Sequence, residues 1–110
     1  MKVRTPDLPA SYWAVIFTNQ LNDDAEGYEQ MAGDMVELAS RQPGFLGIDS
    51  VRGPDGKGIT VSYWRSEDDI VAWKGVAEHL EAQLAGAQRF YSSYSTRVAQ
   101  VSRNYEFRAD

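Results

Sequence analysis

The first strong hydrophobic pattern in the chain is the run YWAVIFT at residues 12–18, which is rich in aromatic and β-branched side chains. Such a run predicts a β-strand. From residue 12 to residue 17 the odd and the even positions are both apolar, so both faces of this strand are hydrophobic. A strand of this kind is normally covered on both sides in the folded protein.

Two later segments carry hydrophobic residues at helical spacing. The first spans residues 25–41, where the polar run Asn22–Asp24 is expected to cap its start and Gln42–Gly44 to end it. Its predicted buried stripe consists of Tyr28, Met31, Met35 and Leu38.

The second helical segment follows Ser66, which is expected to cap it together with Asp69. It runs through residues 70–74, is expected to bend at Gly75, and continues to about Phe90. Its predicted stripe consists of Val76, Leu80, Leu84, Ala87 and Tyr91, and the neighbouring face carries His79, Gln83, Gly86 and Phe90.

Three more strands are predicted. Residues 45–52 and 58–65 flank the turn sequence Gly53-Pro54-Asp55-Gly56, which predicts an antiparallel hairpin. Residues 94–107 are rich in Thr, Val and Tyr and predict a long last strand. Because its alternation is imperfect, we expect a bulge or a change of environment partway along it.

The element order is strand, helix, strand, strand, helix, strand, which predicts an α+β fold of the ferredoxin-like βαββαβ type. Its four-stranded antiparallel sheet carries both helices on one face. The other face is apolar and has no cover within the chain, so we expect a homodimer that packs two sheets face to face. We assign residues 12–107 to this single domain and residues 1–11, with two prolines, to a loose lead-in.

Composition narrows the function. The 110 residues include 11 basic and 16 acidic side chains, and this net charge of −5 argues against a nucleic-acid partner. Cysteine is absent, which excludes disulfides, thiolate metal sites and cysteine nucleophiles. No cluster of histidine and acidic residues has the spacing of a metal site. No hydrophobic run has the length of a membrane span or a signal peptide, so we expect a cytoplasmic protein without a membrane partner.

Three stretches of the chain resemble the antibiotic biosynthesis monooxygenase (ABM) family of dimeric α/β-barrel proteins. They are the turn Gln42–Gly47 (QPGFLG), the strand Ile59–Ser66 (ITVSYWRS), and the positions of Trp73 and His79. The resemblance extends from Tyr12 to Phe107. It implies a ferredoxin-like dimer with a pocket between the sheet and the helices of each subunit. Members of this family include oxygenases that act on phenols or anthrones without a cofactor, and a branch that degrades haem.

The resemblance also implies site residues. Asn19 and Trp73 match an Asn and a Trp of the haem-degrading branch, whereas its haem-ligand position falls on Gln83, one helical turn from His79. For the cofactor-free branch, His79 is the candidate acid–base group, Asn19 the hydrogen-bond donor to an oxyanion, and Trp73 an aromatic wall. The remaining pocket-lining candidates are Phe17, Tyr63 and Gln83.

Three functions follow as hypotheses. The leading one is a cofactor-independent monooxygenase that oxidises a small aromatic, phenolic or quinone-like substrate with dioxygen. The first alternative is a haem-binding or haem-degrading protein of the same fold. The second is a non-catalytic dimeric module that binds a small apolar ligand.

Overall fold

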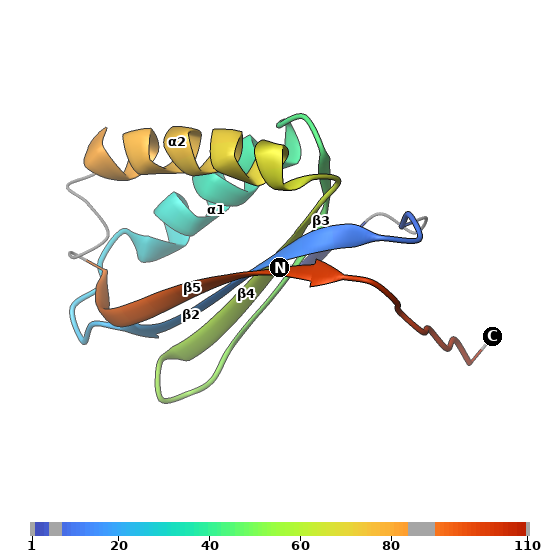
Figure 1. Cartoon of the computed structure of the whole chain (residues 1–110). Coiled ribbons are helices and arrows are strands. Elements are labelled where there is room, and N and C mark those ends of the chain that lie inside the picture. Colours follow the sequence, from blue (N-terminus) through green and yellow to red (C-terminus); the bar gives the residue numbers. More distant parts are fainter. Residues whose placement is uncertain (1, 5–7, 84–89, 110) are drawn as a thin grey trace.

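The computed structural model describes residues 2–4, 8–83 and 90–109, and it shows one antiparallel sheet with both helices on the same face (Figure 1). The sheet has the strand order β1-β3-β4-β2-β5. Its strands are β1 (Lys2–Arg4), β2 (Tyr12–Leu21), β3 (Phe45–Arg52), β4 (Lys57–Trp64) and β5 (Tyr91–Val101). The helices are α1 (Tyr28–Ser40) and α2 (Glu67–Gln83).

The predicted βαββαβ arrangement is confirmed by β2, α1, β3, β4, α2 and β5. The short strand β1 lies within the segment that we expected to be a loose lead-in, and it adds a fifth strand by pairing with β3. Strands β3 and β4 form the predicted hairpin. Its turn is closed by a hydrogen bond from the Gly56 N–H to the Gly53 carbonyl and another from the Gly53 N–H to the Lys57 carbonyl.

The register of the sheet fixes which side chains face the helices. Directly opposed residues of antiparallel strands point to the same side. Trp13 of β2 is opposed by Trp64 of β4, and this pair packs against α2, so the odd-numbered residues of β2 face the helices. The same parity places Asn19, opposed by Gly58, on the helix-facing side, six residues further along β2. At about 3.3 Å per residue, this separation is about 20 Å.

The aromatic core occupies the Trp13 end of this interface. Trp64 is fully buried and packs with Ala39 of α1 and Ile70 of α2. The Trp64 indole Nε1–H donates to the Ser62 hydroxyl, so the one polar group of this side chain is satisfied. Phe45 meets the Trp64 ring edge to face at 5.5 Å. The opposite end of the interface carries the buried polar residue Asn19.

The start of α1 differs from the prediction. The helix begins at Tyr28 rather than Ala25, and no side chain caps it, so the expected capping by Asn22–Asp24 is wrong. The residue before the helix is Gly27, with φ 88°, a left-handed conformation that glycine adopts at little cost. The sharp turn at Gly27 therefore sets the start of the helix.

The start of α2 agrees with the prediction, because the Asp69 backbone N–H donates to the Ser66 hydroxyl at 3.2 Å. That hydroxyl in turn donates to the Asp69 carboxylate at 2.9 Å. The helix then continues without interruption through Gly75, where we expected two segments. Its predicted continuation to Phe90 falls largely on residues 84–89, which lie outside the described residues, as do the predicted stripe members Leu84 and Ala87.

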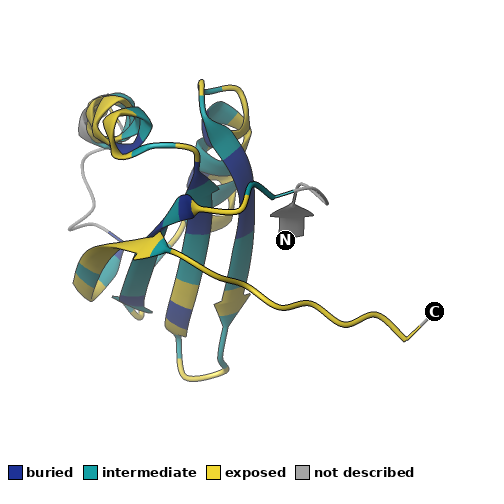
Figure 2. Cartoon of the chain, turned by 45° about the vertical axis from the view of Figure 1, so that its right-hand side comes forward, coloured by how far each residue is buried: buried dark blue, intermediate teal, exposed yellow. Residues whose placement is uncertain are grey.

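Strand β5 begins at Tyr91 and ends at Val101, earlier at both ends than the predicted span of 94–107. Its pairing with β2 shifts register between Gln20 and Leu21, which are opposed by Ser93 and Tyr91, so the irregularity lies before the predicted strand. Residues 102–109 form no strand and are exposed (Figure 2). In the described part of the chain, neither helix is both long and apolar enough to cross a membrane.

Candidate functional site

Asn19 is the most unusual polar residue of the described chain. Its side chain is 4% exposed, and neither its amide nitrogen nor its amide oxygen has a hydrogen-bond partner among the described residues. Leaving a buried amide unpaired costs about 1–3 kcal/mol per group. Because Asn19 faces the helices, its unpaired amide lies between the sheet and the helical layer.

Arg52, the last residue of β3, reaches toward Asn19 across β4. A Cβ built on Gly58 would lie 2.6 Å from the Arg52 guanidinium carbon, so the guanidinium lies where a side chain at residue 58 would be. Gly58 is opposed by Arg52 on one side and by Asn19 on the other. Since neighbouring strands are about 4.8 Å apart, the guanidinium lies about one strand spacing from the strand that carries Asn19.

Tyr28, the first residue of α1, holds Arg52 in place. The Arg52 Nη2–H donates to the Tyr28 hydroxyl at 2.7 Å, and the guanidinium carbon lies 5.0 Å from the centre of the Tyr28 ring. The Arg52 Nη1–H donates to the Gly56 carbonyl at 2.6 Å. The cation is thus held by a phenol and a backbone carbonyl.

Tyr91 extends the same cluster. Burial raises the pKa of the Tyr91 phenol, the neighbouring Tyr28 raises it further, and Arg52 acts in the opposite direction. Its ring contacts the Tyr28 ring edge to face at 5.9 Å. At neutral pH Tyr91 therefore stays protonated, and its hydroxyl is hydrogen-bonded with that of Tyr28.

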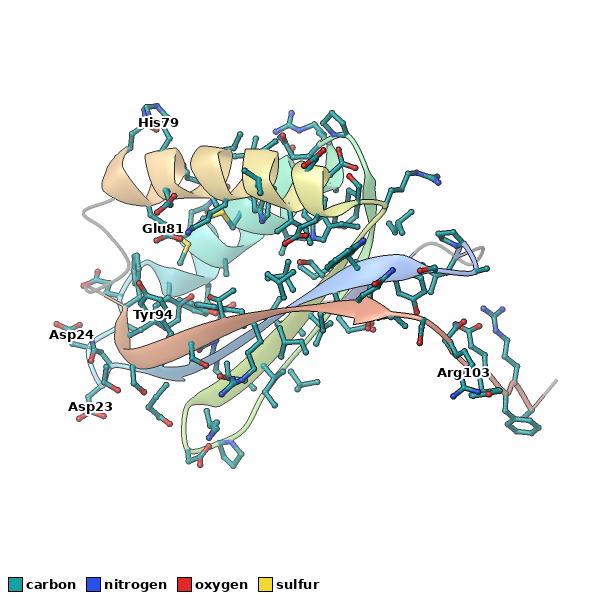
Figure 3. All side chains as sticks on the ribbon, viewed as in Figure 1. Asp23, Asp24, His79, Glu81, Tyr94 and Arg103 are labelled. Carbon is teal, nitrogen blue, oxygen red and sulfur yellow. The ribbon has the colours of Figure 1, made fainter. Side chains whose placement is uncertain are left out.

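Glu81 brings a carboxyl group to the cluster from α2. Figure 3 shows Glu81 on the side of α2 that faces the sheet, and Tyr94 on the helix side of β5. Burial raises the pKa of the Glu81 carboxyl, and the nearby Glu78 adds to this effect. Glu81 also contributes to the raised pKa of Tyr91, which places the two groups within electrostatic reach of each other.

The structure brings two of the predicted site residues together. Phe17 lies two residues before Asn19 on the same face of β2, and its ring contacts Tyr91 at 5.4 Å and Tyr94 at 5.6 Å. Tyr94 is directly opposed to Asn19 and is 54% exposed, so this side of the site meets solvent. Phe17, Tyr91 and Tyr94 give the site an aromatic wall.

Trp73 lies with the core and not with Asn19. Its ring stacks on Trp64 at 5.9 Å with an angle of 24° between the rings. The Trp64 indole is bonded to Ser62, which is four residues from Gly58 along β4, or about 13 Å. In this structure Trp73 completes the hydrophobic core.

His79 and Gln83 lie on the outer side of the helical layer. His79 is exposed and projects away from the sheet (Figure 3), and its Nε2 lies 3.3 Å from the Gln83 amide nitrogen. Both residues line an apolar groove of ≈ 450 Å³ whose other lining residues are Leu38, Ala72, Gly75, Val76 and Leu80. The structure does not bring His79 or Gln83 together with Asn19.

Tyr63 lies on the face of the sheet that the helices do not cover. Its hydroxyl donates to an Asp49 carboxylate oxygen at 2.9 Å, and its ring contacts Tyr12 edge to face at 5.8 Å. Tyr63 therefore cannot line the same side of the sheet as Asn19.

Sequence reasoning missed Arg52, Glu81 and the polar role of Tyr28. Arg52 alternates with Ile48 and Ser50, so all three lie on the helix-facing side of β3. The other side chains there are uncharged, and a single charged residue at such a position indicates a buried cation. Glu81 follows Trp73 and Ala77 at intervals of four residues, which places a carboxyl on the inward side of α2. Tyr28 had no such signal, because a tyrosine fits a buried stripe as well as a site.

The histidine that the haem-binding alternative calls for is not part of this site. His79, the one histidine of the chain, projects from the opposite side of α2, and the polar groups near Asn19 are a guanidinium, phenols and a carboxyl. Among the described residues, no group of three or more histidine, aspartate or glutamate side chains is placed to hold a metal ion.

The fold agrees with what comparison with known proteins shows. The model of the family described as antibiotic biosynthesis monooxygenase matches residues 14–85, more than half of the chain. The chain belongs to the antibiotic biosynthesis monooxygenase family, so the resemblance seen in the sequence is confirmed.

One relative by sequence and two solved structures illustrate the similarity. The uncharacterized protein YqjZ of Bacillus subtilis (strain 168) is 48% identical over 104 residues, which cover 94% of this chain and 90% of that protein. PA3566 from Pseudomonas aeruginosa superposes with a TM-score of 0.66 at 16% identity, covering 86% of this chain and 96% of that chain. A mutant of SnoaB from Streptomyces nogalater, described as a cofactor-independent oxygenase, gives 0.65 at 10% identity, with 86% and 95% covered.

Proposed function

We propose that this protein is a monooxygenase that uses dioxygen to oxidise a small aromatic, phenolic or quinone-like substrate without a cofactor. Membership of the antibiotic biosynthesis monooxygenase family supports the reaction type. The observation that carries the site is the buried, unpartnered amide of Asn19, with the Arg52 guanidinium over the opposed Gly58 and the aromatic rings of Phe17, Tyr91 and Tyr94 on the same face. SnoaB, a cofactor-independent oxygenase of the same fold, supports the absence of a cofactor.

The proposed chemistry needs a substrate made electron-rich by loss of a proton. Glu81 accepts that proton, because its carboxyl faces the sheet and its raised pKa makes it a stronger base than an exposed glutamate. The substrate oxyanion then accepts a hydrogen bond from the Asn19 amide N–H. The anion transfers electrons to dioxygen. For a CH₂ carbon oxidised to C=O, one oxygen atom enters the substrate and the other leaves as water with the two hydrogens.

Asn19→Leu is the sharpest test of the site. The two side chains are of similar size, and leucine removes the unpaired polar group, so we expect unfolding free energy to rise by about 1–3 kcal/mol. Oxygen uptake with phenol and anthrone substrates, measured with a metal chelator present, should fall to background. Asn104→Leu is the control, because Asn104 lies exposed after β5.

Activity that survives Asn19→Leu would contradict the site. Specific binding of aromatic substrates to the wild-type protein with no oxygen uptake at all would instead support a ligand-binding module and contradict the monooxygenase.

We also propose that the protein forms a homodimer through the uncovered face of the sheet. The apolar side chains on this face include Ile59 of β4 and Val51 of β3, which are directly opposed and 40% and 69% exposed. Aromatic side chains that a second copy would cover continue into the tail, where Tyr105 is 86% and Phe107 89% exposed.

Ile59→Asp tests this interface. Light scattering during gel filtration should give a dimer mass for the wild type and a monomer mass for the variant. Val71→Asp is the control, because Val71 is as exposed as Val51 but lies on α2. A monomer mass for the wild type at micromolar concentration would refute the dimer.

A further inference from the structure

We propose that Arg52 and Asn19 together form an oxyanion-binding site, so that the ligand of this protein is an aromatic molecule bound through an ionised oxygen. This inference rests on the site of the proposed function, but it concerns binding and needs no turnover. It assigns a role to Arg52, Tyr28 and Gly58 that the sequence pattern did not reveal.

The first argument is the charge of Arg52. The guanidinium is half-buried, and its described hydrogen bonds go to neutral groups, the Tyr28 hydroxyl and the Gly56 carbonyl. Among the described residues no carboxylate lies within 4.0 Å of it; the one ion pair found there joins Arg41 and Glu37 on the surface of α1. A guanidinium has five N–H donors, and these two bonds use two of them. A partly desolvated cation with donors to spare favours an anion.

The second argument is the direction of the guanidinium. Gly58 has no side chain, and the Arg52 guanidinium lies over its backbone, on the line from β3 to Asn19 of β2. Asn19 and Arg52 thus approach the same place from two strands. One ligand oxygen at that place can accept hydrogen bonds from the Asn19 amide and from the guanidinium.

The third argument is the set of groups that surround this place. Arg52 comes from β3, Tyr28 from α1, Tyr91 and Tyr94 from β5, and Glu81 from α2, and these are the titratable groups of the cluster. Burial and the hydrogen bond with Tyr28 hold Tyr91 in its neutral form, so it adds no negative charge. Among the described groups that we assign to this cluster, Glu81 is the carboxyl, and it acts against an anion whenever it is ionised.

The fourth argument separates an aromatic anion from an inorganic one. The rings of Phe17, Tyr91 and Tyr94 lie in contact with one another beside Asn19. Such a wall favours a planar apolar body attached to the ionised oxygen. A fully hydrated ion such as phosphate gains nothing from it.

The experiment uses the full chain and 4-nitrophenol, whose phenolate absorbs visible light and whose phenol does not. One pH unit below the pKa of free 4-nitrophenol, addition of wild-type protein should increase the phenolate band, because bound phenolate is stabilised. Arg52→Gln should abolish this increase. Arg97→Gln is the matched control: Arg97 is an exposed arginine of β5 whose guanidinium bonds Ser95.

Three further variants test the details. Glu81→Gln removes the opposing carboxylate and should strengthen phenolate binding, whereas Tyr28→Phe removes the phenol that holds Arg52 and should weaken it. Arg52→Lys keeps the charge but not the fork of donors, and should restore part of the effect. If Arg52 had only a structural role, phenolate binding would not depend in this way on the charge at positions 52 and 81.

Calorimetry with 2-naphthoate and its neutral counterpart 2-naphthamide extends the test to carboxylates. The wild type should prefer the anion by about tenfold or more, and Arg52→Gln should bind the two alike. Inorganic phosphate should not compete. An unchanged preference in Arg52→Gln, competition by phosphate, or binding of none of the aromatic probes would overturn the inference. Arg52-dependent binding without oxygen uptake would support it and refute only the proposed monooxygenase.

Discussion

Gly58→Ala is the substitution whose effect the structure defines most closely. The added methyl group would overlap the Arg52 guanidinium at 2.6–2.7 Å, which is closer than Cβ contacts occur. The backbone of a β-strand accepts alanine, so the strain falls on Arg52, the flexible partner. We expect Arg52 to swing out of the site and lose its hydrogen bonds to Tyr28 and Gly56.

The magnitude follows from those contacts. Two charge-assisted bonds of a half-buried guanidinium are taken at about 1 kcal/mol each, below the range of about 1.5–3 kcal/mol for charged groups, because water replaces part of them. The cation–π contact with Tyr28 adds about 0.5–1 kcal/mol. Alanine in place of glycine in a strand stabilises the folded state by about 0.5–1 kcal/mol, which offsets part of this loss. Gly58→Ala should therefore destabilise the protein by about 2 kcal/mol.

The assay is a double-mutant cycle by urea unfolding at fixed protein concentration. In an Arg52→Ala background the methyl group meets no guanidinium, so Gly58→Ala should become neutral or stabilise by up to about 1 kcal/mol. The sign of the effect thus changes with the residue at position 52. Equal destabilisation in both backgrounds would refute the placement of Arg52 over Gly58. It would then also refute the claim that the Arg52 guanidinium points toward Asn19.

Three further predictions use the same unfolding assay. Gly75→Ala should stabilise the protein by up to about 1 kcal/mol, because a Cβ there meets nothing within 4 Å and alanine favours a helix interior; destabilisation would mean that the uninterrupted course of α2 is wrong. Gly44→Ala should destabilise by more than about 1 kcal/mol, since Gly44 has φ +83° and its Cβ would overlap the Asp69 side chain; a neutral result would contradict this turn. Glu81 has a raised pKa in the folded state, so the folded chain keeps the Glu81 proton to a higher pH than the unfolded chain does. The free energy of unfolding therefore falls as pH rises above 4.5, the pKa of glutamate in the unfolded chain. Glu81→Gln should remove this fall and the exposed control Glu26→Gln should not, whereas identical pH profiles would place Glu81 in solvent.

The fold was predictable from the sequence because its signals are local. Strand β2, the hairpin turn at residues 53–56 and the Ser66–Asp69 cap each depend on a few neighbouring side chains. The start of α1 was not, because polar residues 22–24 favour a helix start that the left-handed turn at Gly27 overrides. The ends of β5 depend on pairing with β2, which no local pattern encodes.

Only those parts of the candidate site that depend on a single residue of one strand could be predicted from the sequence. Asn19 was predicted as a site residue of the first strand, and the structure has it buried on the helix-facing side, two residues from Phe17. The neighbours of Asn19 come from β3, α1, β5 and α2, and they meet only through the strand order and through the absence of a side chain at Gly58. A glycine that makes room for an arginine of the adjacent strand leaves no periodic mark in the sequence.

Helix geometry explains why the proposed proton chemistry lies with Glu81 and not with the histidine. Trp73, Ala77 and Glu81 follow one another at four-residue intervals on the inward side of α2. His79 is two residues from both Ala77 and Glu81, and two residues turn a helix by about 200°. A rotation of α2 that brought His79 inward would therefore turn Glu81 outward and pull Trp73 off the buried Trp64 ring. The core contact of Trp73 thus fixes which titratable group of α2 faces the sheet.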